Sequence, residues 1–588
     1  MIQSLKDHHI LGGEYQNYFL LKSVNEIQLP MNVRTVLDSR VDLLSTNEKW
    51  LIRVCAVVGK NIPVNLLKMT FDLRDDELNE LLNTLTEKKF ISKTQEYPEI
   101  IFTFNHDLII ESVYSSILKT QRKEMHLSIL EALEKNFFTD NLEELTLKAN
   151  HAFRGEAWYK AVYYYSILQA NAQERTSCHE SLEFGEKVFE SYHHLTNPSK
   201  EESLIFIRSS YHMSHVLFWL GRNDEVIKFV PEVSEVVKSL NDPMIEAEFY
   251  FSLVSQAYLG CGEYELAEES CYKGLKLIEK EAKKPDMSNQ LLIILEKFFI
   301  LHAHYCLGNF KKTVSYANEM TDYITKEKDE IGGAPILAAT LWAHIGALAQ
   351  LGEFCHAKNM EEFTLEILEK QTPSLNMYHE QCALARKYCY QGDFVNGLKF
   401  VDLSLETSTR MNINMLNPEL LAMKGYILSF KNKPDEAKKY LDMSYELDTK
   451  RKFFFFASNG IDFLCKGYLN LNMIEQAKII LDKLFELGEK RNQKALEVYA
   501  WRLKAEIEMI QNNPSVVQSF IKTINFAEER GMLPEIGHSY RGLFQYYKKI
   551  GDLEKANEFY KKAEDMYKNM GMLFKPELLM VSDVKSHT

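Results

Sequence analysis

Apolar residues recur at helical spacing along most of this chain, and one kind of position interrupts them about every 40 residues. Each of these marker positions is a glycine or an asparagine, the two residues that best tolerate the left-handed conformation ending a helix. The residue five positions later is small or β-branched, which lets two helices approach closely. The markers are Gly221, Gly262, Gly308, Gly352, Gly392, Asn432, Asn472, Asn512 and Gly551, and the later positions are Val226, Ala267, Thr313, Ala357, Gly397, Ala437, Ala477, Val517 and Ala556.

The segments around the markers, such as Leu259–Ala267 and Lys549–Ala556, resemble the tetratricopeptide repeat. That repeat is a helix–turn–helix unit with a usual period of about 34 residues, so the longer period here indicates longer helices or linkers. We therefore expect an all-α fold, a right-handed superhelix of tetratricopeptide-like helix pairs over residues 126–570, with a C-terminal tail over 571–588.

This repeat architecture leads to two predictions about the structure. At least ten helix pairs should follow residue 126, including a looser copy at Arg154–Ala161, and strands should be confined to about residues 90–104. Two aromatic clusters, Tyr163–Tyr165 and Phe453–Phe456, are candidates either for partner anchors or for core residues, and four consecutive aromatics cannot all face one side of a helix.

The first 125 residues have a different pattern. Ser45 and Glu48 fit a capping box that opens a helix, and further helices are predicted over about residues 64–69 and 75–89. A β-hairpin follows over residues 90–104, and Asn105 is well suited to cap the next helix. Three helices and a two-stranded wing predict a winged-helix domain over residues 33–125.

A winged helix raises the possibility of DNA binding. The third helix, which would enter the groove, is acidic at Asp75, Asp76, Glu77 and Glu80, and residues 33–124 hold 13 basic and 14 acidic side chains. Such a surface is repelled by phosphates. A DNA-binding transcriptional regulator therefore remains only an alternative to the leading hypothesis.

The N-terminal motifs also resemble a known class. Arg40–Leu44, Ala56–Gly59 and Phe102–Asp107, followed by Tyr114, Arg122 and His126, are similar to the segment after the nucleotide-binding core of signal-transduction ATPases with numerous domains, of the soluble adenylyl-cyclase or maltose-regulator type. The resemblance implies that this chain corresponds to the C-terminal half of such a protein. Residues 1–32 would be a remnant of the nucleotide-binding domain or its lid, and ATP or ADP would bind only through that missing domain.

His106 is the one residue to which the resemblance assigns a cofactor role. In the immune-receptor branch of that class, a His-Asp pair after the wing senses the β-phosphate of ADP, and His106-Asp107 stands at the matching place. A helix N-terminus suits a phosphate because its free N–H groups carry partial positive charge. The alternative is that Asp107 complements the helix dipole and His106 only packs between wing and helix.

Catalytic and metal-binding motifs are lacking in the sequence. No G-x-x-x-x-G-K-[ST], G-x-S-x-G or H-E-x-x-H occurs. His302, His304, Cys306 and His344 are the best candidates for metal ligands, but we prefer to interpret them as core and groove residues of a helical repeat. The nine cysteines show no C-x-x-C spacing and indicate buried thiols in a reducing compartment.

Charge and hydropathy complete the prediction. The net charge is −14, of which residues 126–588 carry −12, so partners with basic segments are favoured and nucleic acid is not. No run is apolar enough to cross a membrane, and we expect a cytoplasmic location. The leading hypothesis is a non-catalytic regulatory module: the repeats bind a protein or peptide on the concave face, and the winged helix couples to a nucleotide-binding domain. A free-standing repeat scaffold or adaptor is a further alternative.

Overall fold

The computed structural model divides into two units, Met1–His212 and Met213–Thr588, with the division inside helix α11 (Lys200–Leu220). The described residues are 11–12, 19–20, 37, 40–70, 74–97, 99–136, 141–175, 177–281, 287–326, 334–368, 375–411, 413–431, 433–450 and 460–574. Most of the predicted segment 1–32, the aromatic cluster Phe453–Phe456 and the tail beyond residue 574 lie outside them.

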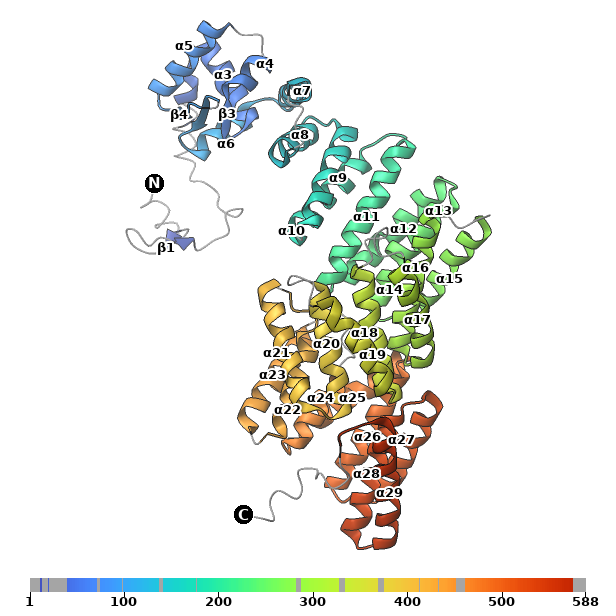
Figure 1. The fold of residues 1–588 in the computed structure, drawn as a ribbon. Coiled ribbons are helices and arrows are strands. Elements are labelled where there is room, and N and C mark those ends of the chain that lie inside the picture. Colours follow the sequence, from blue (N-terminus) through green and yellow to red (C-terminus); the bar gives the residue numbers. More distant parts are fainter. Residues whose placement is uncertain are drawn as a thin grey trace. The chain divides into compact units, whose positions relative to one another are not determined.

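The first unit contains three short helices and a small sheet near residues 46–104 (Figure 1). The helices are α3 (Thr46–Val58), α4 (Val64–Thr70) and α5 (Asp75–Glu87). The antiparallel sheet has the order β3 (Asn61–Pro63), β5 (Ile101–Phe104) and β4 (Ile91–Gln95). The hairpin β4–β5 confirms the predicted one, but strands are not confined to residues 90–104, because β3 and the short strands β1 (Leu11–Gly12) and β2 (Phe19–Leu20) lie outside that range. The three residues of β3 are too few for a period-two pattern to be recognised in the sequence.

Local signals explain how these elements begin. The Ser45 side chain accepts the N–H of Glu48, and the Glu48 carboxylate accepts the N–H of Ser45, so the predicted capping box is present. Leu51, Leu67 and Leu82 from the three helices are at most 1% exposed and share one core with the sheet residue Ile91. The helices and the sheet are therefore held together by apolar burial.

The rest of the first unit is helical. It contains α6 (Asp107–Ser116), α7 (Lys119–Asn136), α8 (Leu142–Arg154), α9 (Trp158–Glu174) and α10 (Cys178–His193), besides a two-residue strand pair, β1 (Leu11–Gly12) with β2 (Phe19–Leu20). One local prediction needs correction, because the N-cap of α6 is His106 rather than Asn105. At the turn between α8 and α9, inside the looser repeat copy, the left-handed residue is Glu156.

The second unit is a series of helix pairs (Figure 1). Helix α12 (Asn223–Ser239) follows α11, and a bent first helix made of α13 (Pro243–Phe249), the π-helical η2 (Tyr250–Ser255) and α14 (Gln256–Cys261) pairs with α15 (Tyr264–Glu281). The remaining pairs are α16 (Met287–Leu307) with α17 (Phe310–Lys326), α18 (Ala334–Leu351) with α19 (Phe354–Leu368), α20 (Leu375–Gln391) with α21 (Phe394–Met411), α22 (Asn417–Ser429) with α23 (Pro434–Lys450), α24 (Ile461–Asn470) with α25 (Ile474–Lys490), α26 (Lys494–Ile510) with α27 (Val516–Arg530), and α28 (Leu533–Ile550) with α29 (Leu553–Met570).

The markers end helices as predicted. Every described marker has a positive φ, between 56° at Asn512 and 87° at Gly392, and Asn432 lies outside the described residues. The positions five residues later are buried with one exception. In that repeat the fully buried residue is Val516, and the predicted Val517 is half-buried. Counting α8 with α9 and α11 with α12, the described residues after 126 form ten helix pairs and no strand, which confirms the all-α, superhelical repeat fold.

Long-range contacts tie together repeats that are far apart in the second unit. The guanidinium of Arg491 donates to the carbonyl of Cys261, 230 residues away. Next to it the Gln493 side chain donates to the hydroxyl of Tyr264 (2.8 Å). Repeats far apart in the sequence therefore touch, and the first helices of successive pairs pack against one another. We call α16, α18, α20, α22, α24, α26 and α28 the inner helices.

Candidate functional site

His106, the residue singled out by resemblance, is exposed at the start of α6. Its side chain makes no capping hydrogen bond, and the neighbouring Asp107 forms an ion pair with Lys60 (3.2 Å). This is an accessible helix N-terminus. The assignment of His106 to nucleotide sensing stays a prediction.

Three other residues of the same motif form a cluster between α6, α7 and α8. The hydroxyl of Tyr114 lies 2.9 Å from Nε2 of His126, whose Nδ1 lies 2.9 Å from Nδ1 of His151. The guanidinium groups of Arg122 and Arg154 lie 4.9 and 5.7 Å from the ring centre of Tyr114. Burial, together with the neighbouring His151, lowers the pKa of His126 to about 3, so this imidazole stays neutral at physiological pH.

The candidate metal ligands do not form a metal site. His302, His304, Cys306 and His344 are all at most 7% exposed. His302 bonds the carbonyl of Phe298 through Nδ1, and His304 faces Asn309 and Glu268. Within the described residues, no group of three or more His, Cys, Asp or Glu side chains could hold a metal ion. All nine cysteines are free thiols, and most are buried, as predicted.

The tyrosine cluster on α9 is divided between core and surface. Tyr165 is 4% exposed, whereas Tyr163 is 49% exposed. The hydroxyl of Tyr164 donates to Glu134 (2.9 Å). Only one of the three tyrosines is thus available as an exposed anchor.

The main concentration of polar chemistry is a buried network on the inner helices, which the sequence analysis did not identify. On α20, Arg386 makes a bidentate ion pair with Glu419 of α22 (2.5 and 2.8 Å), and both side chains are 2% exposed. The same guanidinium donates to the hydroxyl of Tyr305 (2.9 Å) and lies 4.4 Å from the ring centre of Trp342.

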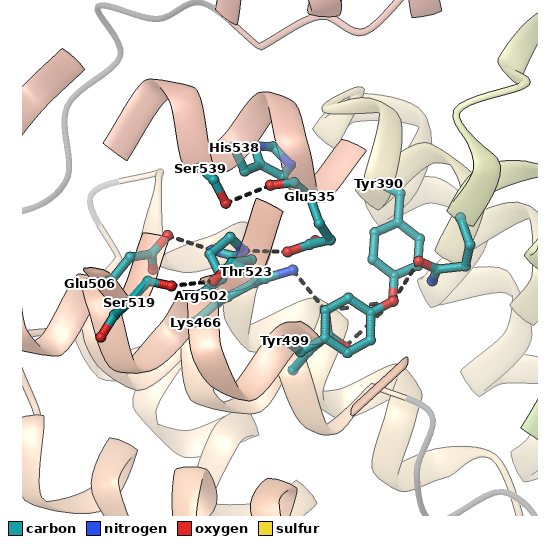
Figure 2. Close-up of polar contacts among 12 residues, drawn as sticks. Tyr390, Lys466, Tyr499, Arg502, Glu506, Ser519, Thr523, Glu535, His538 and Ser539 are labelled. Atoms are coloured by element: carbon teal, nitrogen blue, oxygen red, sulfur yellow. Dashed lines mark hydrogen bonds and ion pairs between the residues drawn. The ribbon is translucent and has the colours of Figure 1, made fainter. Parts of the chain in front are cut away.

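A second part of the network links α24 with Tyr390 of α20 and Tyr499 of α26 (Figure 2). Lys466 donates to Asp462 (2.7 Å), and the two side chains are 9% and 2% exposed. The hydroxyls of Tyr390 and Tyr499 lie 3.3 Å apart, and Tyr499 donates to Gln350 (2.5 Å). Burial raises the pKa of both tyrosines well above the ordinary value, so both are neutral hydrogen-bonding groups.

The third part surrounds Arg502 of α26, as Figure 2 shows. Its guanidinium donates to Glu535 of α28 and to Glu506 of its own helix. Arg502 is 2% exposed, yet its Nη2 has no hydrogen-bond partner. Beside it, Nδ1 of His538 lies 2.8 Å from the hydroxyl of Tyr567, and burial together with nearby cations lowers the pKa of His538 well below the ordinary value.

Two small cavities open onto this network. One, of about 30 Å³, is lined by Tyr305, Arg386, Tyr390 and Tyr499, among others. The other, also about 30 Å³, is lined by Lys466, Arg502, Glu506, Arg541 and Phe574, among others. A cavity of this size exceeds the roughly 10–15 Å³ that a single water molecule needs. Each cavity therefore has room for a small polar group such as a water molecule or a carboxylate oxygen.

A signal for the network is present in the sequence at fixed distances before the markers. The position six residues earlier gives Arg386, Lys466 and Glu506, and the position ten residues earlier gives Asp462, Arg502 and Arg541. These offsets lie on one helix face because they differ by four residues. In other repeats the position ten residues before the marker is uncharged, as at Trp342 and Ala422. Aligning the repeats on their markers and comparing equivalent positions would therefore have revealed the charged helix face.

Comparison with known proteins gives matches of low sequence identity. No known protein family matches the chain. An uncharacterised protein of Rhizobium meliloti (strain 1021) is 21% identical over 258 residues, covering 44% of this chain and 25% of that protein. The chain therefore matches only a quarter of the length of that relative.

Several solved structures are similar at low identity. A Rap protein complexed with competence and sporulation factor is 12% identical, with 73% of this chain and 98% of that chain covered and a TM-score of 0.36. A signal transduction ATPase with a tetratricopeptide repeat sensor from Pyrococcus horikoshii is 13% identical, with coverages of 86% and 67% and a TM-score of 0.35. The Cut9–Hcn1 hetero-tetramer is 11% identical, with coverages of 76% and 85% and a TM-score of 0.40. The helix pairs of this chain and the left-handed residues between their helices define a tetratricopeptide-like helical repeat fold.

Hydropathy adds one result. Among the described residues, no helix is both long and apolar enough to cross a membrane.

A buried carboxyl group on α16 gives a testable pH dependence. Glu296 is fully buried, and burial raises its pKa to about 9. In the unfolded chain this group ionises near its ordinary value, so unfolding releases a proton between these pH values and stability falls as pH rises. We expect Glu296→Gln, which is neutral at every pH, to gain stability over the wild type by up to about 1.4 kcal/mol per pH unit between roughly pH 5 and 9. Urea denaturation at several pH values measures this difference, and parallel profiles for the two proteins would contradict it.

Proposed function

We propose that this chain is a non-catalytic, regulatory protein-interaction module, and that the inner helices of residues 213–574 bind a segment of a partner protein. The observation that carries this proposal is the buried network on consecutive inner helices. Arg386, Lys466 and Arg502 are each desolvated and held by a carboxylate. A buried ion pair adds little stability compared with apolar side chains of the same volume. A row of such pairs is therefore better explained by recognition than by folding alone.

We also propose a role for the N-terminal part. The proposed winged helix over residues 33–125 is supported by three helices and an antiparallel sheet among its described residues, and by resemblance this domain couples to a nucleotide-binding domain. Asp75, Asp76 and Glu80 on α5 are exposed, which disfavours contact with DNA phosphates. In the same proposal, the exposed His106 contacts ADP held by the separate nucleotide-binding domain, and residues 126–570 form the repeat sensor.

The inner-helix proposal is tested with a matched pair of double variants. Asp462→Leu/Lys466→Met removes a buried ion pair on α24, whereas Glu486→Leu/Lys490→Met removes an exposed pair of the same spacing on α25, 57% and 73% exposed. Peptides selected from a display library on the full chain should bind the α25 variant as they bind the wild type. We expect the α24 variant to bind them at least about tenfold more weakly, because a charged hydrogen bond is worth about 1.5–3 kcal/mol.

Fluorescence anisotropy with the selected peptides measures these affinities, and circular dichroism confirms that both variants fold. Equal affinity for the α24 variant and the wild type would place binding elsewhere and refute the proposal.

A further inference from the structure

The chain ends its described part with a short segment that docks on the inner helices. After α29, the N–H of Leu573 donates to the carbonyl of Gln391 (2.8 Å), and the Gln391 side chain donates to the carbonyl of Gly571 (3.0 Å). Gln391 is the last residue of α20, about 180 residues earlier in the sequence. The segment is thus held by its backbone, in the way an extended peptide is held.

The Phe574 side chain fills an aromatic recess at this place. Its ring lies 4.9 Å from that of His538, edge to face, and 5.8 Å from that of Phe394. Gly392 makes room for it, because a Cβ there would lie 2.9 Å from the Phe574 ring. Gly392 is one of the repeat markers, so its lack of a side chain serves both the turn and the recess.

Behind Phe574 lies the cavity that holds unsatisfied donors. Nη2 of Arg502 and Nε of Arg541 are buried and have no hydrogen-bond partner, and both residues line this cavity. Three cations and one carboxylate line it, namely Lys466, Arg502, Arg541 and Glu506. Buried guanidinium N–H groups without an acceptor are costly. An anionic oxygen at this place would satisfy them.

We propose that this recess and cavity together form a receiving site for an extended segment of a partner protein that carries an aromatic residue next to a carboxylate, and that Gly571–Phe574 occupies the aromatic part until the partner displaces it. This inference rests on the proposed function and names its partner chemistry. The aromatic ring takes the place of Phe574, and the carboxylate accepts from Arg541 and Arg502. Because the unsatisfied groups of this cavity are N–H donors, a basic segment of the kind favoured by the net charge of −14 would find no acceptor among them.

The test uses the full chain and two labelled peptide probes with amidated C-termini, Gly-Met-Leu-Phe-Asp and Gly-Met-Leu-Phe-Asn. We expect the Asp probe to bind the Phe574→Ala chain at least about tenfold more tightly than the wild type, because the competing segment has lost its anchor. On that chain, the Asn probe should bind about tenfold or more weakly than the Asp probe. Adding Arg541→Met should abolish this preference, whereas Arg410→Met on α21, whose side chain is 61% exposed, should leave it unchanged.

Phe574→Leu is the milder variant if Phe574→Ala perturbs folding, and it should give a smaller gain in the same direction. Equal affinity of the wild type and both Phe574 variants for the Asp probe would refute displacement. Equal affinity for the Asp and Asn probes would refute the anionic part. If library peptides without an aromatic–acid pair still depend on Asp462 and Lys466, the proposed function stands and only this inference fails.

Discussion

Replacing Arg386 with alanine should lower the free energy of unfolding of the second unit by about 3–5 kcal/mol. The substitution leaves the Glu419 carboxylate 2% exposed and without its bidentate partner. It also removes the donor to Tyr305 and the cation over Trp342. Urea denaturation followed by circular dichroism measures the loss, read from the transition of this unit because repeat arrays need not unfold in one step.

Two controls separate the buried charge from the loss of side-chain volume. Arg386→Met/Glu419→Leu removes both charges and should recover most of the stability, because an apolar pair of similar volume often replaces a buried ion pair at little cost. Arg410→Ala breaks a pair with Glu406 whose side chains are 61% and 55% exposed, and should cost less than about 1 kcal/mol. An Arg386→Ala effect as small as that of Arg410→Ala would contradict our account of the network.

Leu441→Ala should cost about 4 kcal/mol, near the upper part of the range for buried leucines. Leu441 of α23 is fully buried and packs between two glycines. A Cβ at Gly425 or at Gly467 would lie 2.6 Å from its side-chain carbons. Since neither glycine has a side chain to move into the space, the cavity left by Leu441 stays open.

The two glycines also provide the control. Gly467→Ala should destabilise the wild type through its clash with Leu441, but should recover about 1 kcal/mol in the Leu441→Ala background, because one methyl group partly fills the gap. Leu553→Ala on α29, at 66% exposed, should change the stability by less than about 0.5 kcal/mol. Additive effects of Gly467→Ala and Leu441→Ala would show that the two positions do not share a cavity.

The turn residues between helices made it possible to recognise the repeat from the sequence. The turns at residues 262, 472 and 512 need a left-handed backbone conformation, which few residues other than glycine and asparagine adopt at low energetic cost. This requirement depends only on the local chain. The capping box at Ser45 is equally local. Where a local prediction failed, the neighbouring residue took the predicted role. His106 is the N-cap in place of Asn105, and Val516 is the buried residue in place of Val517.

The sequence alone thus determined the helix pairs, their period and the absence of motifs for phosphate binding or hydrolysis, because these depend on residues within one or two turns of chain. The interior site was decided only by the tertiary structure. Arg386 meets Tyr305 across 81 residues, Tyr390 meets Tyr499 across 109, and Gln391 meets Gly571 across 180. Such meetings depend on how far each repeat rotates against the next. That rotation is the sum of many packing contacts along the superhelix, and no local pattern encodes it.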